Sequence, residues 1–323
     1  MYDHLNRTKK SFRFMGTDSN DKPAVVAEGP SVGGQAVQNW TLLRLLPLLI
    51  FDLVDVTTAE WAFLLLLREG VELVCAPKLS QAQVLYLNRL VKAYVAERLN
   101  LFPDVRLRPK HHYLLHYPWL ITVFGPLIRV WTMRMETKHT FFKRAIRSAQ
   151  NFVNVTKTLS ETHQLNQAYL SSGVRLYDID EPAHDCMPFD SKLFADAVVK
   201  AVSHCRQLIG PLQCCSSVTV KGTKYCKDSV VVINYVESMP SFAKVILCLL
   251  DAHGKYGLLV KNLKSEKHNA LGLYVVADNE NAECFKCVLI DDLWDYCPLP
   301  SYSVNGLPHI ALKHALYDCM AQQ

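Results

Sequence analysis

The sequence predicts an α+β protein in which an all-helical unit precedes a small β-barrel-like domain. Up to about Pro211, apolar residues recur at every third or fourth position, which is the period of an amphipathic helix. Beyond Pro211 they alternate with polar residues, as expected for strands with one buried face. Half of the 323 residues are hydrophobic, so the chain is expected to bury a substantial core.

The same patterns divide the chain into five segments. Gly29-Pro30 and Gly33-Gly34 oppose regular structure near the start, and an acidic, turn-rich stretch follows residue 172. We expect a flexible arm at 1–36, a helical domain at 37–172, a linker with one helix at 173–215, a β-rich domain at 216–315 and a tail at 316–323.

Capping residues mark the helices before residue 102. Thr57 and Thr58 come just before Glu60, which predicts a capped helix running to about residue 74. Ser80 with Gln83 gives the same signal for a helix that reaches about residue 98.

Several classes of protein are excluded by the first half of the chain. Residues 1–14 are polar, so no signal peptide is expected. The apolar region at 42–67 is interrupted by charged residues and a proline, so it predicts two buried helices rather than a membrane span. Two of these charges, Asp52 and Asp55, fall in the turn between the helices, where we do not expect a catalytic metal site. Eleven cysteines without a secretory signal indicate reduced thiols in the nucleus or cytoplasm.

Residues 106–147 carry the clearest functional signal. They contain nine Lys or Arg but one carboxylate, Glu136, although the whole chain has a net charge of only +5. Basic residues interleaved with aromatic ones are typical of surfaces that bind phosphates and bases. We therefore expect DNA contacts from Arg129, Arg134, Lys138, His139, Lys143, Arg144 and Arg147. His111, His112 and His116 are further candidate site residues.

Two helices are predicted within this basic block, and two more follow it. Pro109 can open a helix at its first turn, and Gly125-Pro126 ends that helix. The next is expected from about Thr132 to Arg147, with Glu136 on its basic face. In such a position Glu136 could simply pair with a polar neighbour on a solvated face. Further amphipathic helices are expected at 154–171 and 189–208.

The β-rich part is expected to hold five or six short strands in a small barrel or curled sheet. His253-Gly254 and Asn305-Gly306 are hairpin signals. Cys284 and Cys287 resemble half a zinc site, but on a strand their side chains face opposite ways, so we expect no zinc. Core packing is favoured over a cation-binding aromatic pocket for Tyr235, Phe242, Tyr256, Tyr274, Trp294, Tyr296 and Tyr302.

The spacing of His-His, Gly-Pro and Glu-x-Lys-His in residues 109–144 is distinctive. The chain resembles the C-terminal part of animal CACTA (En/Spm-like) transposases and of host proteins derived from them, and this spacing makes the resemblance specific. The resemblance covers residues 33–172 and, more loosely, the β-rich part. It rests on PKHHYLLHYP, FGPLIRVWTMRMETKHTFFKR, QNWTLLRLLPLLI and NFVNVTKTLSETHQLNQAYL.

This resemblance implies a piece of a DDE-type transposase, whose RNase H-like core uses two Asp and a later Glu to hold divalent metals. Glu136 matches the position of the late Glu. The strands that would carry the Asp residues belong upstream, where residues 1–40 are polar and turn-rich. The helical domain would then be the C-terminal piece of that core with its helical insertion. Mg²⁺ or Mn²⁺ is expected only if a complete site is assembled, and no cofactor is expected for the chain alone.

Two functions remain open at this stage. The first is a transposase-derived DNA-binding protein of the nucleus or cytoplasm, truncated, not catalytic by itself and of low sequence specificity. Self-association, and an unidentified ligand for the β-rich domain, are compatible with it, whereas a membrane partner is not expected. The second is a protein-interaction module with helical and β-barrel surfaces and no DNA role. Only the first predicts that DNA affinity falls steeply with salt.

Overall fold

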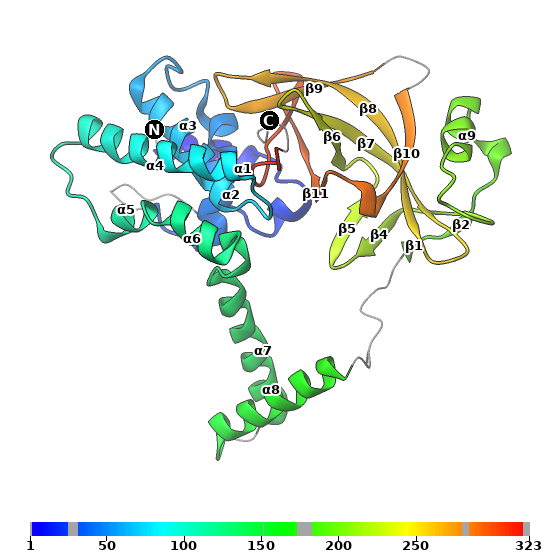
Figure 1. Ribbon diagram of the computed structural model, residues 1–323, viewed down its shortest axis with the longest axis horizontal. Coiled ribbons are helices and arrows are strands. Elements are labelled where there is room, and N and C mark those ends of the chain that lie inside the picture. Colours follow the sequence, from blue (N-terminus) through cyan, green and yellow to red (C-terminus); the bar gives the residue numbers. More distant parts are fainter. Residues whose placement is uncertain (1, 25–31, 151, 173–182, 280–283, 319–323) are drawn as a thin grey trace.

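A computed structural model describes residues 2–24, 32–150, 152–172, 183–279 and 284–318. It confirms that the protein is a mixture of helices and antiparallel sheets, with most helices in the first half of the chain. The first helices gather beside a large curved sheet, and a pair of long helices projects away from this body (Figure 1).

The helical unit begins near the N-terminus and runs to residue 171. Its α-helices are α1 (Tyr2–Ser11), α2 (Ala36–Ile50), α3 (Ala59–Val74), α4 (Gln81–Leu101), α5 (Pro109–Leu114), α6 (Tyr117–Phe124), α7 (Met133–Ala149) and α8 (Val155–Ser171). Two 3-10 helices accompany them, η1 (Gly16–Ser19) and η2 (Leu127–Arg129). None of the described helices is both long and apolar enough to cross a membrane.

The predicted caps begin the helices as expected. The side chain of Thr58 accepts a hydrogen bond from the Trp61 N–H at the start of α3, and Ser80 and Gln83 form a reciprocal capping box at the start of α4. One predicted helix is instead two, because α5 ends at Leu114 and α6 starts at Tyr117. Pro118 explains the break, since its ring and missing N–H are incompatible with a continuous helix.

The second half holds the strands and one further helix. The strands are β1 (Ala183–His184), β2 (Met187–Pro188), β3 (Gln213–Cys215), β4 (Ser217–Val220), β5 (Thr223–Cys226), β6 (Val230–Val236), β7 (Met239–Leu250), β8 (Tyr256–His268), β9 (Leu273–Asp278), β10 (Phe285–Leu289), β11 (Asp295–Leu299), β12 (Ser301–Val304) and β13 (Leu307–Ile310). In the described part of this half, the 3-10 helices η3 (Ser191–Leu193) and η5 (Ile290–Asp292) lie among them. The helix expected at 189–208 is shorter, α9 (Asp196–Ser203), and it buries Val198, Ala201 and Val202 as predicted.

The large sheet is antiparallel and has the order β11-β6-β7-β8-β9-β13-β12, with β10 on β8 and β3 on β7. A smaller sheet has the order β1-β4-β5. The ends of the large sheet, β11 and β12, do not pair with each other in the described part of the chain. The prediction of a barrel-like domain is therefore wrong. Pro298 gives a physical reason, since it removes a donor from β11 and is tolerated at an open edge. The described strands do not show an RNase H fold either.

Both predicted hairpin turns are present. Asn305 and Gly306 take positive φ angles of 51° and 77° between β12 and β13, as a tight hairpin turn requires. Gly254 has a φ of 78° in the loop between β7 and β8. These turns fix the register of the strands that they connect.

The start of the chain differs from the extended arm that we expected at 1–36. It contains α1, and Phe14 lies in a core cluster with Leu45, Leu49 and Tyr302. In the same segment the Asp18 carboxylate pairs with the buried Arg44 guanidinium at 3.0 Å and accepts a hydrogen bond from the Tyr302 hydroxyl at 2.7 Å.

The helical unit and the sheet are joined through α3. Trp61 Nε1–H donates to the carbonyl oxygen of Ala270 at 2.6 Å, in the turn between β8 and β9. Arg68 donates to the next two carbonyl oxygens, those of Leu271 and Gly272, at 3.0 and 2.9 Å. Both donor side chains are buried, so this contact belongs to the core and not to a loose interdomain surface.

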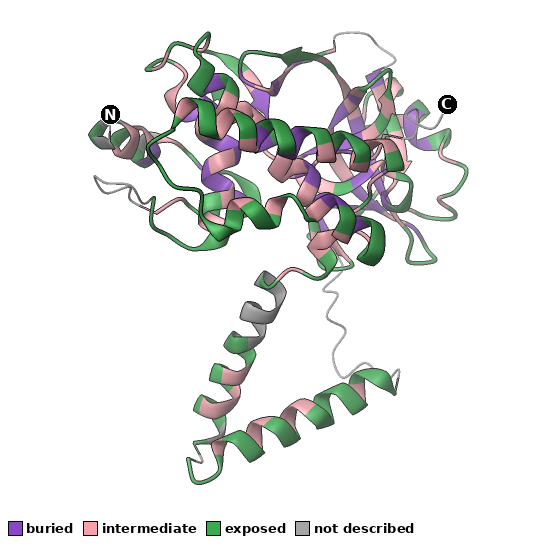
Figure 2. Cartoon of the chain, turned by 60° about the vertical axis from the view of Figure 1, so that its left-hand side comes forward, coloured by how far each residue is buried: buried purple, intermediate pink, exposed green. Residues whose placement is uncertain are grey.

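Helices α7 and α8 form a hairpin that stands apart from the rest of the molecule (Figure 1). The described residues of this hairpin are exposed or half-buried (Figure 2). Phe142 of α7 faces His163 of α8, with 5.7 Å between their ring centres. The described residues of the hairpin are therefore largely accessible to solvent or to a binding partner.

Candidate nucleic-acid interface and the adjacent pocket

The last three turns of α7 carry an exposed group of cationic side chains. We call His139, Lys143, Arg144 and Arg147 the basic face, and all four are exposed. Within the described residues, Lys143, Arg144 and Arg147 form no ion pair. By contrast Lys157 on α8 lies 3.7 Å from Glu161 one turn later. The basic face is thus a concentration of charge that the described chain leaves unneutralised.

Three other predicted residues share this helix. Arg134, Glu136 and Lys138 fall within α7, so the helix expected around Glu136 is present. Their side chains lie outside the described residues. Glu136 is consequently placed on a helix by its backbone, and its partners stay a matter of prediction.

The three candidate histidines lie on and beside α5. His111 Nδ1 accepts a hydrogen bond from the Arg108 N–H at 3.0 Å, which caps the helix. The Nε2 atoms of His112 and His116 are 3.1 Å apart, and both rings are exposed. His111 therefore has a local structural contact, whereas His112 and His116 form a surface pair.

Asp52 and Asp55 lie between α2 and α3, as the sequence indicated. Asp55 Oδ1 accepts hydrogen bonds from the N–H and the hydroxyl of Thr57 at 2.9 and 2.6 Å, and these two bonds lower the pKa of Asp55. In the described part of the chain, no three His, Cys, Asp or Glu side chains are grouped as metal ligands.

The seven aromatic residues of the β-rich part do not surround one cavity. Phe242 and Tyr302 are buried in two different core clusters. Tyr235 and Tyr274 line a cleft beside α3, while Trp294 and Tyr296 line another pocket. Core packing therefore explains Phe242 and Tyr302, whereas the other four residues named here line two separate pockets. The pocket that contains Trp294 and Tyr296 also contains Arg129 of the basic block.

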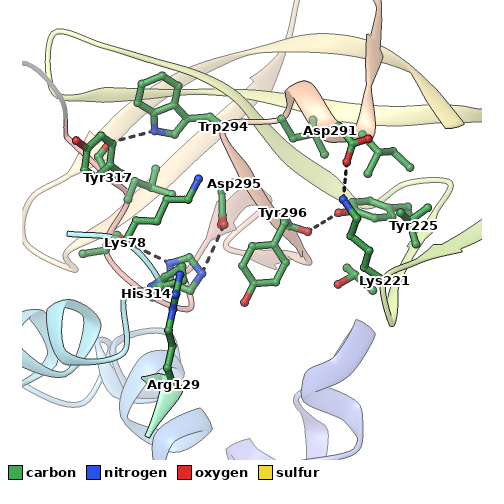
Figure 3. Close-up of a pocket in the computed structure, with 17 residues that line it drawn as sticks. Lys78, Arg129, Lys221, Tyr225, Asp291, Trp294, Asp295, Tyr296, His314 and Tyr317 are labelled. Carbon is green, nitrogen blue, oxygen red and sulfur yellow. Dashed lines mark hydrogen bonds and ion pairs between the residues drawn. The ribbon is translucent and has the colours of Figure 1, made fainter. Parts of the chain in front are cut away.

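This pocket lies where the helical unit meets the sheet and has a volume of about 390 Å³ (Figure 3). Lys78, from the loop between α3 and α4, and Arg129, at the end of η2, come from the helical side. Lys221, Tyr225 and the segment from Ile290 to Tyr296 form the opposite wall. The C-terminal segment around His314 completes the lining.

Two of the three cationic side chains in this pocket are available to a ligand. Lys221 Nζ is 2.8 Å from Asp291 Oδ1, so its charge is already paired. Lys78 and Arg129 are exposed and form no ion pair within the described parts of the chain. Figure 3 shows Lys78 and Arg129 among the residues that line the pocket.

A buried acid and a buried histidine are among the residues that line the pocket. Asp295 and His314 are 6% and 5% exposed, and His314 Nε2 is 3.6 Å from Asp295 Oδ1. That distance suits an ion pair but is too long for a hydrogen bond, so Nε2 has no hydrogen-bond partner in the described structure. Burial raises the pKa of Asp295, although His314 and two backbone N–H groups offset part of that effect.

Neighbouring contacts hold these two side chains in place. The Ala315 N–H donates to Glu72 O at 2.9 Å, and Gln83 Nε2–H donates to Leu316 O at 2.7 Å, which fixes the C-terminal segment against α3 and α4. On the other wall the Tyr225 hydroxyl donates to Tyr296 O at 2.6 Å. The pocket is therefore built from fixed segments of both halves of the protein.

Sequence reasoning missed Lys78, Asp295 and His314. The first and last of these are 236 positions apart, and no local pattern could bring them together. A signal did exist for Asp295, which stands between Trp294 and Tyr296 at the start of a strand. A carboxylate flanked by two aromatic residues at the start of a strand is a candidate for burial, and a buried carboxylate calls for an explanation.

Comparisons with known proteins add no relative to this description: no protein-family model, curated protein or solved structure matches the chain.

Proposed function

We propose that this protein binds nucleic acid through the basic face of α7, and that it is a truncated or domesticated derivative of a CACTA-type transposase without catalytic activity of its own. The observation that carries the binding proposal is the exposure of Lys143, Arg144 and Arg147 on a projecting helix, where they form no ion pair with any residue that the structure describes. The origin is supported by the sequence resemblance alone.

Phosphate is the partner that such a face suits best. Clustered cations repel one another, and a polyanion relieves this repulsion while releasing its own counterions. Arg offers a planar fork to phosphate oxygens, and Lys offers a point charge. Contacts of this kind hold the backbone of a duplex without reading its bases, so low sequence specificity is expected. Arg129, Arg134 and Lys138 are proposed to extend the same face toward the body of the protein.

Glu136 is proposed to be a remnant of a catalytic site. Divalent ions need several oxygen ligands, and a single carboxylate would leave Mg²⁺ or Mn²⁺ largely hydrated and weakly held. A complete site would require Asp residues from another segment or chain. For this chain alone we propose binding without strand cleavage, in the nucleus or the cytoplasm.

The test is a DNA-binding titration over a series of salt concentrations. Replacing Lys143, Arg144 and Arg147 with Ala should weaken binding to a random duplex and flatten the salt slope by about 0.9 unit for each lost phosphate contact. The control variant removes three cations of the sheet, Lys244, Lys261 and Lys264, and so lowers the net charge equally. Two of these are already paired, with Asp228 and Asp278.

An equal change in both variants would show that net charge alone governs binding, and an unchanged slope in the α7 variant would reject the basic face. An absence of salt-dependent DNA binding by the wild type would favour the alternative function, a protein-interaction module with no DNA role. The observation in favour of that alternative is the apolar surface around the hairpin, where Phe152, Val153 and Leu165 are 71%, 86% and 71% exposed. Self-association of the hairpin would then become the leading explanation.

A further inference from the structure

The pocket between the helical unit and the sheet has the chemistry of a ligand site, separate from the basic face of α7. Its volume of about 390 Å³ lies near the lower end of the roughly 300–1,000 Å³ that is usual for small-molecule sites. That size suits one nucleotide better than a run of several. Among the residues of the proposed nucleic-acid interface, the pocket contains Arg129.

We infer that this pocket binds a single phosphorylated nucleoside, with the phosphate against Lys78 and Arg129 and the base against Tyr296. The nucleotide could be free in solution or stand at the end of a DNA strand, since both present the same phosphate and base. The inference goes beyond the proposed DNA contacts of α7 and does not depend on them.

The position proposed for the phosphate follows from the lining cations that form no ion pair with a described residue. Lys221 is held by Asp291, so the charge of Lys78 and Arg129 is what the pocket offers to an anion. Lys78 comes from the loop between α3 and α4 and Arg129 from the end of η2, and both are exposed, so a phosphate bound to them would keep part of its hydration. Charge-assisted hydrogen bonds of this type are about twice as strong as neutral ones.

The base end follows from the aromatic wall. Tyr296 is 51% exposed. The centres of the Tyr296 and His314 rings are 6.2 Å apart, and the two ring planes make an angle of 25°. Figure 3 shows Tyr296 standing in the middle of the pocket. The exposed part of this ring offers a surface on which a base can stack. The Trp294 Nε1–H is not available to hydrogen-bond a base, because it already donates to Tyr317 O.

The polar floor supplies a position for a hydrogen bond to the ligand. His314 Nε2 is buried and has no hydrogen-bond partner in the described structure, although Asp295 is 3.6 Å away. Leaving a buried polar atom unpaired costs free energy that a ligand group can recover. A sugar hydroxyl of a nucleoside, which can donate or accept a hydrogen bond, would satisfy Nε2 in either tautomer of the ring. Inorganic phosphate would engage the cations without reaching the aromatic wall.

The experiment measures the fluorescence of the full chain during titration with deoxyadenosine 5′-monophosphate, and separately with deoxyadenosine and with inorganic phosphate. Saturable binding of the nucleotide below about 1 mM, tighter than that of either fragment, is expected. Replacing Lys78 and Arg129 together with Ala should weaken nucleotide binding by about tenfold or more and leave deoxyadenosine binding unchanged. Tyr296→Ala should weaken the binding of both. All three side chains are exposed, so the variants should fold, and far-UV circular dichroism checks this.

Lys221→Ala is the matched control, because it removes a lining cation that is already paired, and it should change nucleotide affinity less than about twofold. No saturable nucleotide binding, or equal binding of nucleotide and phosphate, would overturn the inference. So would a Lys78 and Arg129 double variant that binds like the wild type. Oligonucleotides with a 5′-phosphate or a 5′-hydroxyl then identify the source: a preference for the phosphate indicates a strand end, and its absence indicates a free nucleotide.

The two proposals can fail separately. The α7 variant that lacks Lys143, Arg144 and Arg147 should still bind deoxyadenosine 5′-monophosphate as the wild type does. Loss of nucleotide binding in that variant would show that the pocket is not an independent site. Conversely, salt-dependent duplex binding without any nucleotide binding would remove the pocket proposal and leave the basic face in place.

Discussion

Arg44→Met is predicted to cause a large loss of stability. The Arg44 side chain is 2% exposed and connects three distant segments. Its Nη1 and Nη2 groups donate to Asp18 Oδ1 and Oδ2 at 3.0 and 3.3 Å, and Nε–H donates to Leu312 O at 3.0 Å. Methionine fills a similar volume but provides no donor, so both the carboxylate and the carbonyl group would lose a partner.

Removing one partner from a buried ion pair typically costs about 3–5 kcal/mol, because the other charge stays buried without compensation. Here the Tyr302 hydroxyl would still donate to Asp18 Oδ2, so the middle of that range is the expected cost. A whole domain is usually stable by about 5–15 kcal/mol, and the loss should therefore be obvious. Asp18→Asn should also destabilise, since it leaves the guanidinium buried without its counter-charge.

The assay is urea unfolding, followed by far-UV circular dichroism and by tryptophan fluorescence. The Arg44 guanidinium carbon is 5.7 Å from the centre of the Trp40 ring, which makes Trp40 a local reporter. The double variant Asp18→Asn, Arg44→Met should be less destabilised than the sum of the single variants by about 1–3 kcal/mol. Additivity within about 0.5 kcal/mol, or a loss of less than about 1 kcal/mol for Arg44→Met, would refute the reasoning.

The dependence of folding stability on pH in the acidic range gives an independent check on the Asp18–Arg44 ion pair. Burial by itself would raise the pKa of Asp18, but Arg44 and Tyr302 more than offset it, and the net result is a pKa below the usual 3.8. A depressed pKa in the folded state stabilises the protein above the unfolded-state pKa. This contribution is lost as the pH falls through the folded-state pKa. The difference between wild type and Asp18→Asn should accordingly be constant above about pH 4 and shrink below it.

Two further predictions concern His309 and Glu136. Burial lowers the pKa of His309 below 6.5, so from about pH 6.5 downward the unfolded chain binds a proton that the folded chain does not, and stability falls. His309→Gln should remove this pH dependence from urea unfolding curves measured between pH 7 and 5, and an unaltered dependence would assign it to other groups. For Glu136, a nicking assay with Mg²⁺ or Mn²⁺ should detect no cleavage by the chain alone, and Glu136→Gln should leave folding intact and strengthen DNA binding if it changes it. Robust cleavage that Glu136→Gln abolishes would show that partner ligands exist, and Asp52 and Asp55 would be tested first.

Local signals predicted the helices and hairpins well because local contacts decide them. Thr58 and Ser80 each cap a helix by accepting a hydrogen bond from the backbone N–H three residues later. Asn305-Gly306 adopts the positive φ angles that its residue types favour. The split between α5 and α6 was missed although Pro118 was visible. The periodic apolar residues on both sides of Pro118 outweighed the breaker in our interpretation, whereas the missing N–H decides the structure.

Contacts between distant segments were beyond the sequence. Asp18 is 26 residues from Arg44 and 284 residues from Tyr302, and nothing in the polar sequence near the N-terminus marks it as buried. Closure of a sheet is equally non-local: the strands and their order can suggest a barrel, but the pairing of the last edges depends on the curvature of every strand between them. The open edges at β11 and β12 could be found only in three dimensions.

The candidate site shows the same division between local and non-local information. The composition of residues 106–147 predicts a surface for phosphates, but the sequence presents them as one continuous block. In the structure the block serves different neighbourhoods: Arg129 lines a pocket against the sheet, whereas Arg144 and Arg147 stand on a hairpin exposed to solvent. A duplex that neutralises the hairpin therefore does not have to fill the pocket. One run of basic sequence can in this way provide both a broad electrostatic contact and, through Arg129, one wall of a selective cavity.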